Sequence, residues 1–387
     1  MIHVPEIAVV LDLAVEPARG ILRGFMKYIR LHTPWNVNFV SKTVNDVDPS
    51  SLENWNGDAI VAHTPNQETL RAIFSKRCPT ALLARHESVP VSNKEPFIEP
   101  TYVLCDNVTV GRMAADYFLK KKFRHFAYVC YSKDVPWCRE RRAAFQDALA
   151  QRQYKVDCFE PAQNEDWFTQ RDKLRDWLLG LPKPVAALAA NDLRGRQILE
   201  TCQYADIPVP YDVAVLGVDN DQPVCEMSYP SLSSISIDWE QAGFLCAQSL
   251  DQALKGKTPH PACYGPLSVV SRNSTESFQI SDRLVVQILE TIRITRGVNL
   301  RVCDILDALP VSERSAQERF KKAIGHTIME EIKTARLKYI CELIEQTNLS
   351  FNEIALSFGF ENANHLGQMF KKEFGVTMSQ YRRQCRT

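Results

Sequence analysis

Residues 6–275 alternate short apolar runs rich in β-branched residues with segments of helical periodicity, and this alternation stops after residue 275. Such alternation is typical of a parallel sheet covered by helices, because parallel strands are buried on both faces. From residue 282 to the C-terminus only the helical period remains. The pattern predicts a two-part chain: an α/β domain over 1–275, a linker over 276–281 and an all-α domain over 282–387.

Eight runs in the first part are predicted to be strands: 7–11, 37–40, 59–62, 81–84, 102–104, 125–129, 185–189 and 213–218. Polar side chains stand at the carboxyl ends of nearly all the strands in this part, and ligands bind at that edge of open α/β sheets. A small-molecule site is therefore predicted there. Carboxylates in such positions also cap helices and form turns, so both interpretations stay open for any single residue. The residues in this row are Asp12, His63, Arg85, Asp106, Asp192, Asp219 and Asp238.

The charge of the chain divides unevenly between the two parts. The whole sequence balances 46 Lys and Arg against 46 Asp and Glu, which by itself argues against a nucleic-acid partner. Residues 281–387, however, hold 16 basic and 13 acidic residues, leaving 30 and 33 in residues 1–280. The mildly basic segment is the one with only helical periodicity.

The twelve cysteines are scattered singly, with no C-x-x-C pair and no Cys/His cluster of zinc-ligand spacing. They are predicted to be reduced thiols, and no metal or cofactor is expected. Residues 1–15 contain no basic region, and Glu6 and Asp12 interrupt their apolar stretch, so neither a signal peptide nor a membrane helix is predicted. These features predict a cytoplasmic protein with no membrane partner.

An internal repeat marks the C-terminal part. Residues 319–325, Arg-Phe-Lys-Lys-Ala-Ile-Gly, reappear 50 positions later as Met-Phe-Lys-Lys-Glu-Phe-Gly at 369–375. Each copy has the pattern of a short apolar helix, a tight turn and a second helix, which is typical of a helix-turn-helix. The predicted helices are 302–309 and a second one capped by Ser312, then 351–358 and 362–374, with Gly359 at the second turn.

The second helices carry the side chains that this interpretation needs. Early residues of a helix in the major groove contact base edges, and lysines near its end neutralise phosphates. The alternative is an amphipathic helix end with solvated lysines, which two copies at a fixed offset make the weaker interpretation. The candidates for base contact are Arg314, Gln317, Glu318, Asn364, His365 and Gln368, and those for phosphate contact are Lys321, Lys322, Lys371, Lys372, Arg382 and Arg383.

Residues 300–383 resemble the double helix-turn-helix domain of the AraC/XylS family of transcription regulators. The matching stretches are 311–312, 319–322, 335–337, 354–355, 359–360, 370–375 and 381–382. The resemblance implies a linker helix over about 328–346 and adds Ala363 to the base-contacting positions. Pro310 stands where many relatives have glycine, and Ala316 replaces a larger apolar residue, so the first copy is predicted to have a differently shaped turn and looser packing.

Residues 6–275 resemble the two-lobed sensor domain of LacI/GalR regulators and of periplasmic sugar-binding proteins. The matching stretches are 106–111, 141–145, 190–192, 217–220, 234–238 and 270–275. The resemblance implies two lobes joined by three crossings, near Asn107, Asp238 and Pro266. It also implies sugar contacts by Arg141, Asp192 and Asp219, and then by Arg19, Arg85, Asp106 and Trp137. For Trp137 a packing role between the lobes stays the alternative.

Together the two resemblances imply a sugar-responsive, sequence-specific DNA-binding regulator without catalytic activity, most simply an activator that responds to D-xylose. The implied partners are operator DNA, RNA polymerase and a second copy of the chain. One alternative keeps the regulator but gives it another effector or none. A second is an α/β enzyme using Asp192 and Asp219 as an acid/base pair, which the absence of G-x-G-x-x-G, P-loop and G-x-S-x-G motifs disfavours.

Overall fold

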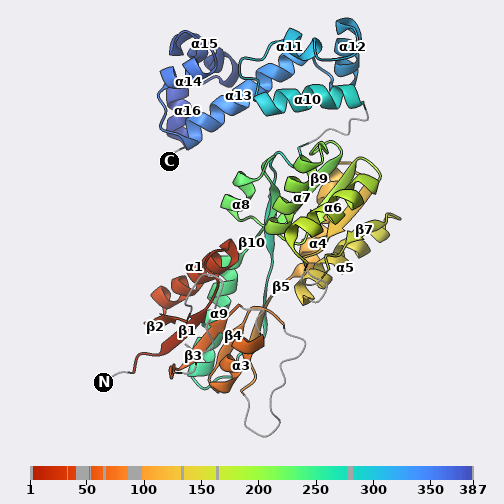
Figure 1. Cartoon of the computed structure of the whole chain (residues 1–387). Helices are drawn as coiled ribbons and strands as arrows, with labels where there is room; N and C mark the ends of the chain where they lie inside the picture. The colour runs from red at the N-terminus through yellow and green to blue at the C-terminus, as the bar shows by residue number, and fades with distance from the viewer. Residues whose placement is uncertain are drawn as a thin grey trace. The chain divides into compact units, whose positions relative to one another are not determined.

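The computed structural model describes residues 3–32, 34–40, 52, 54–63, 67–85, 98–131, 135–162, 165–276 and 282–385. The chain divides into two compact units, Met1–Ser277 and Phe278–Thr387 (Figure 1). Of the predicted linker over 276–281, only residue 276 is among the described residues.

The described part of the first unit contains two six-stranded sheets, each with helices packed on it (Figure 1). Lobe 1 is built on the all-parallel sheet of order β11-β5-β4-β3-β1-β2. Its strands are β1 (Glu6–Val10), β2 (Asn36–Phe39), β3 (Ala59–Ala62), β4 (Thr80–Leu82), β5 (Thr101–Cys105) and β11 (Ala262–Tyr264), and its helices are α1 (Glu16–Leu31), α3 (Gln67–Ser75) and α9 (Trp239–Leu254).

Lobe 2 is built on the sheet of order β12-β10-β9-β8-β6-β7, in which only β12 is antiparallel to its neighbour. Its strands are β6 (His125–Val129), β7 (Val156–Phe159), β8 (Val185–Ala189), β9 (Val213–Asp219), β10 (Ser233–Ile237) and β12 (Pro266–Val270). Its helices are α4 (Asn107–Lys120), α5 (Pro136–Ala150), α6 (Trp167–Gly180), α7 (Asp192–Tyr204) and α8 (Gln222–Met227).

The chain passes between the lobes three times, after β5, after β10 and after β11. The crossings are bonded to one another: the Asp106 backbone N–H donates to the Tyr264 carbonyl (2.7 Å), and the Asp238 N–H donates to the Gly265 carbonyl (3.0 Å). The predicted crossings near Asn107, Asp238 and Pro266 are thus confirmed.

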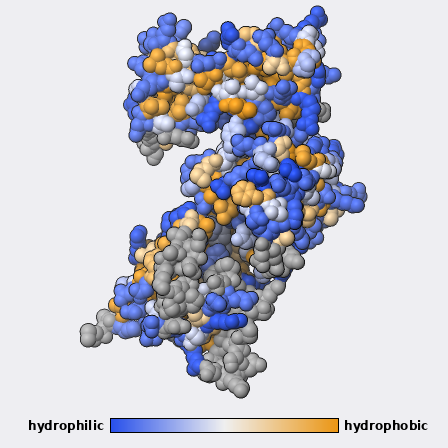
Figure 2. Space-filling view, in the orientation of Figure 1, coloured by the Kyte–Doolittle hydropathy of each residue, from blue (hydrophilic) through white to orange (hydrophobic). Residues whose placement is uncertain are grey.

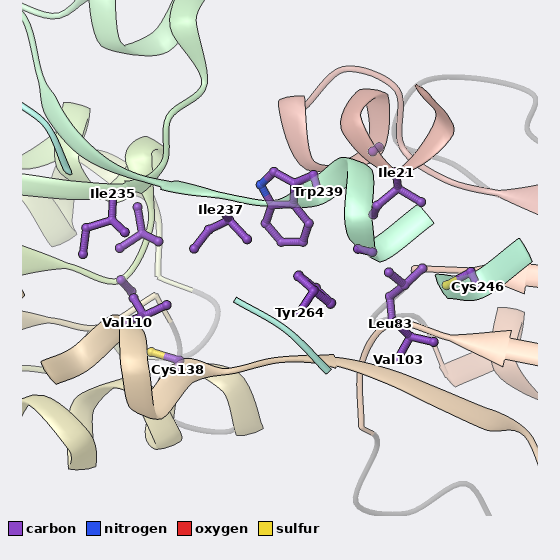
Figure 3. Close-up of a cluster of buried hydrophobic side chains, with 14 of the residues drawn as sticks. Ile21, Leu83, Val103, Val110, Cys138, Ile235, Ile237, Trp239, Cys246 and Tyr264 are labelled. Atoms are coloured by element: carbon purple, nitrogen blue, oxygen red, sulfur yellow. The ribbon is translucent and has the colours of Figure 1, made fainter. Parts of the chain in front are cut away.

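One hydrophobic core continues from lobe 1 through the crossings into lobe 2. Figure 3 shows Ile237, Trp239 and Tyr264 between side chains of lobe 1, such as Ile21, and side chains of lobe 2, such as Val110. The segments that cross between the two sheets carry buried apolar side chains, so the crossings are part of the hydrophobic core.

Helices α1 and α9 pack backbone against backbone at the side of lobe 1 that leads to the crossings. A Cβ atom at Gly243 would lie 1.8 Å from the Ile21 carbonyl oxygen, and one at Gly24 would lie 1.8 Å from the Glu240 carbonyl oxygen. Only glycine permits this close approach, because it has no Cβ atom. Gly24 and Gly243 therefore help to fix where α9 begins after its crossing.

The described part of the second unit contains seven helices: α10 (Arg283–Thr295), α11 (Val302–Leu306), α12 (Glu313–Ile324), α13 (Ile328–Gln346), α14 (Phe351–Ser357), α15 (Ala363–Phe374) and α16 (Met378–Cys385). In Figure 1, α13 runs from the α10–α12 end of the unit to the α14–α16 end. Ile340 and Ile344 of α13 share a buried core with Leu366 and Phe370 of α15. The helix predicted over 328–346 has these bounds.

Some predicted elements differ from the structure. The helix expected over 302–309 ends at Leu306, because the chain turns before Pro310, where a helical conformation of the preceding residue is disfavoured. The predicted strands missed β7, β10, β11 and β12. Three of these, β7, β11 and β12, lie at sheet edges. The fourth, β10, has the sequence Ser-Ser-Ile-Ser-Ile, and its serines do not resemble the apolar run that is typical of a buried strand.

Hydrophilic residues cover most of the face seen in Figure 2, with smaller hydrophobic areas between them. Within the described ranges, no helix combines the length and the apolar character needed to cross a bilayer. All twelve cysteines lie in those ranges and are free thiols.

Candidate ligand site and nucleic-acid interface

The carboxyl ends of strands from both lobes meet at the crossings, because β5 ends where the chain enters lobe 2 and β10 ends where it returns to lobe 1. A hydrogen bond joins the two lobes at this interface between them. The Glu16 backbone N–H, at the start of α1 in lobe 1, donates to Asp221 Oδ2 in lobe 2 (2.9 Å). The predicted row of polar residues is therefore divided between two facing edges.

Arg141 of α5 is the buried cation of this interface and is only 3% exposed. Its Nη1 donates to the Ala190 carbonyl and its Nη2 donates to Asn107 Oδ1 (3.0 Å). The guanidinium is thus held by two hydrogen bonds within the protein, and its buried Nε–H has no acceptor among the described residues.

Asp192 and Asp219 lie together on the lobe 2 side. Asp192 is 2% exposed, and its two oxygens accept hydrogen bonds from Ser234 Oγ (2.6 Å) and from the Asp221 backbone N–H (2.7 Å). Burial raises the pKa of Asp192 to about 7. Burial, and then the nearby Asp192 carboxylate, raise the pKa of Asp219 well above its ordinary value, whereas Arg141 acts in the opposite direction.

The turn after β9 places Asp219 with an unusual backbone. Asp219 has φ +112° and Asn220 has φ +53°, both in the region that favours glycine. The turn is held by the Asn220 N–H donating to Ser234 Oγ (3.0 Å) and by Arg272 Nη2 donating to Asn220 Oδ1 (2.9 Å). Non-glycine residues in such conformations cost on the order of 1–3 kcal/mol and cluster at functional sites.

The carboxylates of Asp192 and Asp106 accept hydrogen bonds from other groups of the protein. Asp192 holds the turn that carries Asp219, since both of its oxygens are occupied by protein donors. Asp106 is the N-cap of α4 and accepts from the Thr109 backbone N–H (2.9 Å) and hydroxyl (2.5 Å). For Asp106 the capping interpretation describes the structure.

The three other predicted residues lie at different depths. Arg19 lies beside Asp221, with 3.5 Å between Nη2 and Oδ1, and donates to the Ala14 carbonyl (2.7 Å). Trp137 is half-buried, and its ring centroid lies 5.1 Å from the Arg141 guanidinium carbon. Arg85 follows β4 and is exposed. Trp137 is therefore brought to the central arginine, and Arg85 is not.

Trp239 is a residue of this interface that the sequence prediction missed. It is the first residue of α9, is 8% exposed, and lies beside Tyr264 (Figure 3) with 5.4 Å between the ring centroids. Its ring centroid lies 6.3 Å from that of His63. Its buried indole N–H has no acceptor among the described residues. Its position directly after Asp238, at a predicted crossing, was the available signal.

In the second unit, matching caps set the bounds of the two predicted recognition helices. The Ser312 hydroxyl caps α12, and the Asn362 side chain caps α15 by accepting from the Asn364 N–H (2.9 Å). Both helices end at a glycine in the left-handed region, Gly325 (φ +93°) and Gly375 (φ +72°). Their bounds differ by the 50 positions of the sequence repeat, as predicted.

Each recognition helix buries one face and exposes the other. Ala316 and Phe320 of α12, and Leu366 and Phe370 of α15, are 0% exposed. Ala363 is half-buried and its N–H donates to Asn352 Oδ1 (3.0 Å). The other predicted DNA-contacting residues of the two helices are all exposed: Arg314, Gln317, Glu318, Lys321, Lys322, Asn364, His365, Gln368, Lys371 and Lys372.

Several of these residues have partners on the same helix. Arg314 Nε donates to Glu318 Oε1 (2.9 Å), and Gln317 Nε2 donates to Glu313 Oε1 (3.0 Å). Arg382, a predicted phosphate contact, donates from Nη2 to the Leu349 carbonyl (2.8 Å) and stacks on Phe351. The structure therefore places Arg382 in the packing of the unit.

Two family models match the chain. A periplasmic binding protein-like domain matches residues 115–275, and a helix-turn-helix domain matches residues 305–384.

Similar proteins extend the likeness to nearly the whole chain. The chain is 28% identical to a xylose operon regulatory protein of Haemophilus influenzae, over 95% of each chain. It is 27% identical to one of Escherichia coli (strain K12), over 94% of this chain and 93% of that one. Its fold matches the solved structure of a xylose-binding transcription activator with a TM-score of 0.84, at 24% identity and over 98% of each chain. The predicted combination is confirmed: the chain carries a periplasmic-binding-protein-like domain followed by a helix-turn-helix domain of the kind found in DNA-binding regulators.

Proposed function

We propose that this chain is a D-xylose-responsive transcription activator that binds operator DNA and catalyses no reaction. A sensor domain, residues 1–275, binds the sugar between its lobes, and a linker over 276–281 leads to a DNA-binding domain over 282–387. The observation that carries the proposal is the pair of capped, exposed recognition helices at a fixed offset, on a chain whose other unit holds a buried arginine with an unpaired N–H. The names of the relatives support xylose as the effector.

In this proposal Arg141 and Asp219 bind sugar hydroxyls, and Asp192 holds the turn that carries Asp219. A guanidinium N–H donates to a hydroxyl oxygen, and a protonated carboxyl group both donates and accepts. Trp137 and Trp239 supply aromatic faces for the C–H side of the ring, and Arg19 closes the interface from lobe 1. Closure around the sugar shifts the population of the sensor toward one conformation. The active form is a cytoplasmic homodimer that contacts RNA polymerase.

The sugar assignment is tested by thermal unfolding of the full chain with D-xylose, L-arabinose, D-ribose and D-glucose. A ligand at 100 times its dissociation constant stabilises the bound state by about 2.7 kcal/mol, so D-xylose should raise the midpoint more than the other sugars. Asp219→Asn should remove the shift, whereas Asp157→Asn, on the exposed edge of β7, should keep it. A chain that none of the sugars stabilises contradicts the effector assignment and leaves the DNA-binding proposal standing.

The DNA assignment is tested by selecting duplexes from a random pool with the full chain and measuring affinities by fluorescence anisotropy. Arg314→Ala and Gln368→Ala should each relax the preference at one base pair by about 1–3 kcal/mol. Lys371→Ala should weaken all duplexes alike and lower the salt slope by about 1. Unchanged base preference in both alanine variants would show that these helices do not contact the bases.

A further inference from the structure

The turn that carries Asp219 is held by an arginine from near the end of the first unit. Arg272 Nη2 donates to Asn220 Oδ1 (2.9 Å), and its Nη1 donates to the Leu232 carbonyl (3.0 Å). Asn220 follows Asp219 directly, and both residues have a positive φ, a conformation that persists in non-glycine residues only where the surroundings hold it. The guanidinium of Arg272 is therefore one of the groups that keep the turn in this conformation.

Arg272 belongs to residues 271–275, which we call the exit segment because they lie at the end of the first unit. The Arg272 backbone N–H donates to Ser233 Oγ of β10 (2.7 Å), and Ser274 Oγ donates to the Val215 carbonyl of β9 (2.6 Å). Ser274 is 0% exposed. The exit segment is therefore bonded to β9 and β10, the two strands whose carboxyl ends lead to the ligand interface.

Two adjacent serines of β10 connect the exit segment with the turn. Ser233 Oγ accepts from the exit segment, whereas Ser234 Oγ accepts from the Asn220 N–H (3.0 Å) and donates to Asp192 Oδ1 (2.6 Å). The Arg272 side chain bridges the same two regions directly, although it is 52 residues from Asn220 in the chain. A change in the turn therefore alters hydrogen bonds that the exit segment makes.

We propose that Arg272 is a positioning residue for the sugar and couples the exit segment to the ligand site. The inference rests on the proposed function, in which Asp219 binds a sugar hydroxyl. Arg272 holds Asn220, and the backbone of Asn220 fixes the direction of the Asp219 carboxyl group. Coupling between two sites is reciprocal, so a sugar that selects this turn also stabilises the hydrogen bonds of the exit segment. Arg272 itself binds protein groups and does not contact the sugar.

Sugar affinity tests the positioning role, with D-xylose as the probe and calorimetry of the full chain as the measurement. Arg272→Met removes both donors, and Asn220→Gly removes the acceptor while keeping a residue that readily adopts a positive φ. Each should weaken D-xylose binding by about two- to thirtyfold, the range in which substitutions change coupling between sites. Because both substitutions break one contact, the double variant should bind about as weakly as Arg272→Met alone. Arg175→Met, which removes a surface pair of α6, is the control and should keep the wild-type affinity.

Amide hydrogen exchange tests the coupling in the wild-type full chain. The Arg272 N–H donates to Ser233 Oγ (2.7 Å), and the Ser274 N–H donates to the Ser231 carbonyl (2.9 Å). Saturating D-xylose should slow exchange in the peptide that contains residues 271–275 by about two- to thirtyfold, and by less than about twofold in Asn220→Gly. A purely structural role of Arg272 would lower the unfolding stability of the variants and leave their sugar affinity and this slowing unchanged.

The possible outcomes separate this inference from the proposed function. A wild type that binds D-xylose while Arg272→Met and Asn220→Gly bind it equally well overturns the positioning role. If Arg272→Met does not fold, the affinity of Asn220→Gly decides the same point. Binding of D-xylose to the wild type without slower exchange at residues 271–275 overturns the coupling. Each of these results leaves the proposed function standing, whereas a wild type that does not bind D-xylose overturns the proposed effector and this inference with it.

Discussion

The two units present their predicted binding residues in opposite ways. In the first unit, Arg141 and Asp192 are 3% and 2% exposed and are bonded to buried partners. In the second unit, the side chains of Arg314 and Glu318 are 89% and 67% exposed and pair with each other. One predicted site is therefore held in place by buried contacts, whereas the other is a solvated surface.

This difference decides which physical effects govern each site. Burial shifts the pKa values of Asp192 and Asp219 in the first unit and makes each hydrogen bond there costly to lose. In the proposed function, an exposed arginine in the second unit acts on DNA through charge and base contact, so its effect on affinity should depend on salt. Substitutions in the first unit should thus change both binding and stability, and those on the recognition surfaces should change binding alone.

Arg141→Met should have the largest effect and tests the buried side of the comparison. It removes the donors to Asn107 and Ala190 and the buried Nε–H that has no acceptor among the described residues. Truncating one partner of a buried, hydrogen-bonded charged group costs about 2–5 kcal/mol in binding, so D-xylose affinity measured by calorimetry should fall at least about thirtyfold. Arg139→Met on the same helix is the control. Retained sugar affinity in Arg141→Met would show that the buried guanidinium only holds parts of lobe 2 together.

Gly243→Ala should destabilise the first unit and leave the second folded. The added methyl group would overlap the Ile21 carbonyl at 1.8 Å, and overpacking costs about 1–3 kcal/mol. All six tryptophans lie in the first unit, so tryptophan fluorescence during urea unfolding reports on that unit alone. Gly180→Ala, whose methyl group meets no atom within 4 Å, is the control. Equal stability of the two variants would mean that α1 and α9 separate without cost.

Sequence patterns predicted the parts of this structure that depend on periodicity and repetition. The offset of α12 and α15 follows from the 50-residue repeat, which is a local property of the chain. The helix Ile328–Gln346 and the crossings near Asn107 and Asp238 followed from resemblance. Where local pattern and tertiary context differ, as in the serine-rich β10, prediction failed, because the Ser233 and Ser234 hydroxyls find buried partners only in the folded sheet.

The same limit applies to the predicted ligand residues. A carboxylate after a strand has the same local sequence whether it caps a helix, as Asp106 does, or lies near an arginine, as Asp219 does. The distinction depends on what the other lobe brings close. Trp239 was missed for a related reason: an indole beside a crossing is recognised as part of the interface only when Tyr264 and His63, distant in sequence, are seen around it.

The two units should also differ in how their stability depends on pH. The pKa of Asp192 is raised in the folded state to about 7, from about 3.9 in the unfolded chain. A group whose folded pKa is raised contributes stability that is fully present below the unfolded value and is lost as pH rises through the folded value. Tryptophan-monitored stability should therefore carry a contribution that declines between about pH 4 and pH 7, and Asp192→Asn should flatten this decline.

In the second unit the sign is opposite. Hydrogen bonds lower the pKa of Asp282, Glu330 and Glu353, so their contributions are lost as pH falls below the unfolded values. Helix content of the second unit should therefore be lost on acidification, below about pH 4. A slope between pH 4 and pH 7 that is the same in wild type and Asp192→Asn would show that this carboxyl group does not titrate with folding.

Glu318→Gln should have the smallest effect and tests the exposed side of the comparison. Glu318 accepts from Arg314 Nε on an open helix surface, and such i,i+4 pairs contribute only about 0.3–0.5 kcal/mol, so the unfolding midpoint should hardly change. Removing the negative charge frees Arg314 and reduces repulsion from phosphates. Affinity for unrelated duplexes should therefore rise a few-fold at low salt, and this gain should disappear at high salt because exposed charges are screened. Glu313→Gln, at the first position of α12, is the matched control. A large loss of stability in Glu318→Gln would show that folding of α12 depends on the Arg314–Glu318 pair. The surface of α12 would then resemble the buried site of the first unit, where substitutions change both binding and stability.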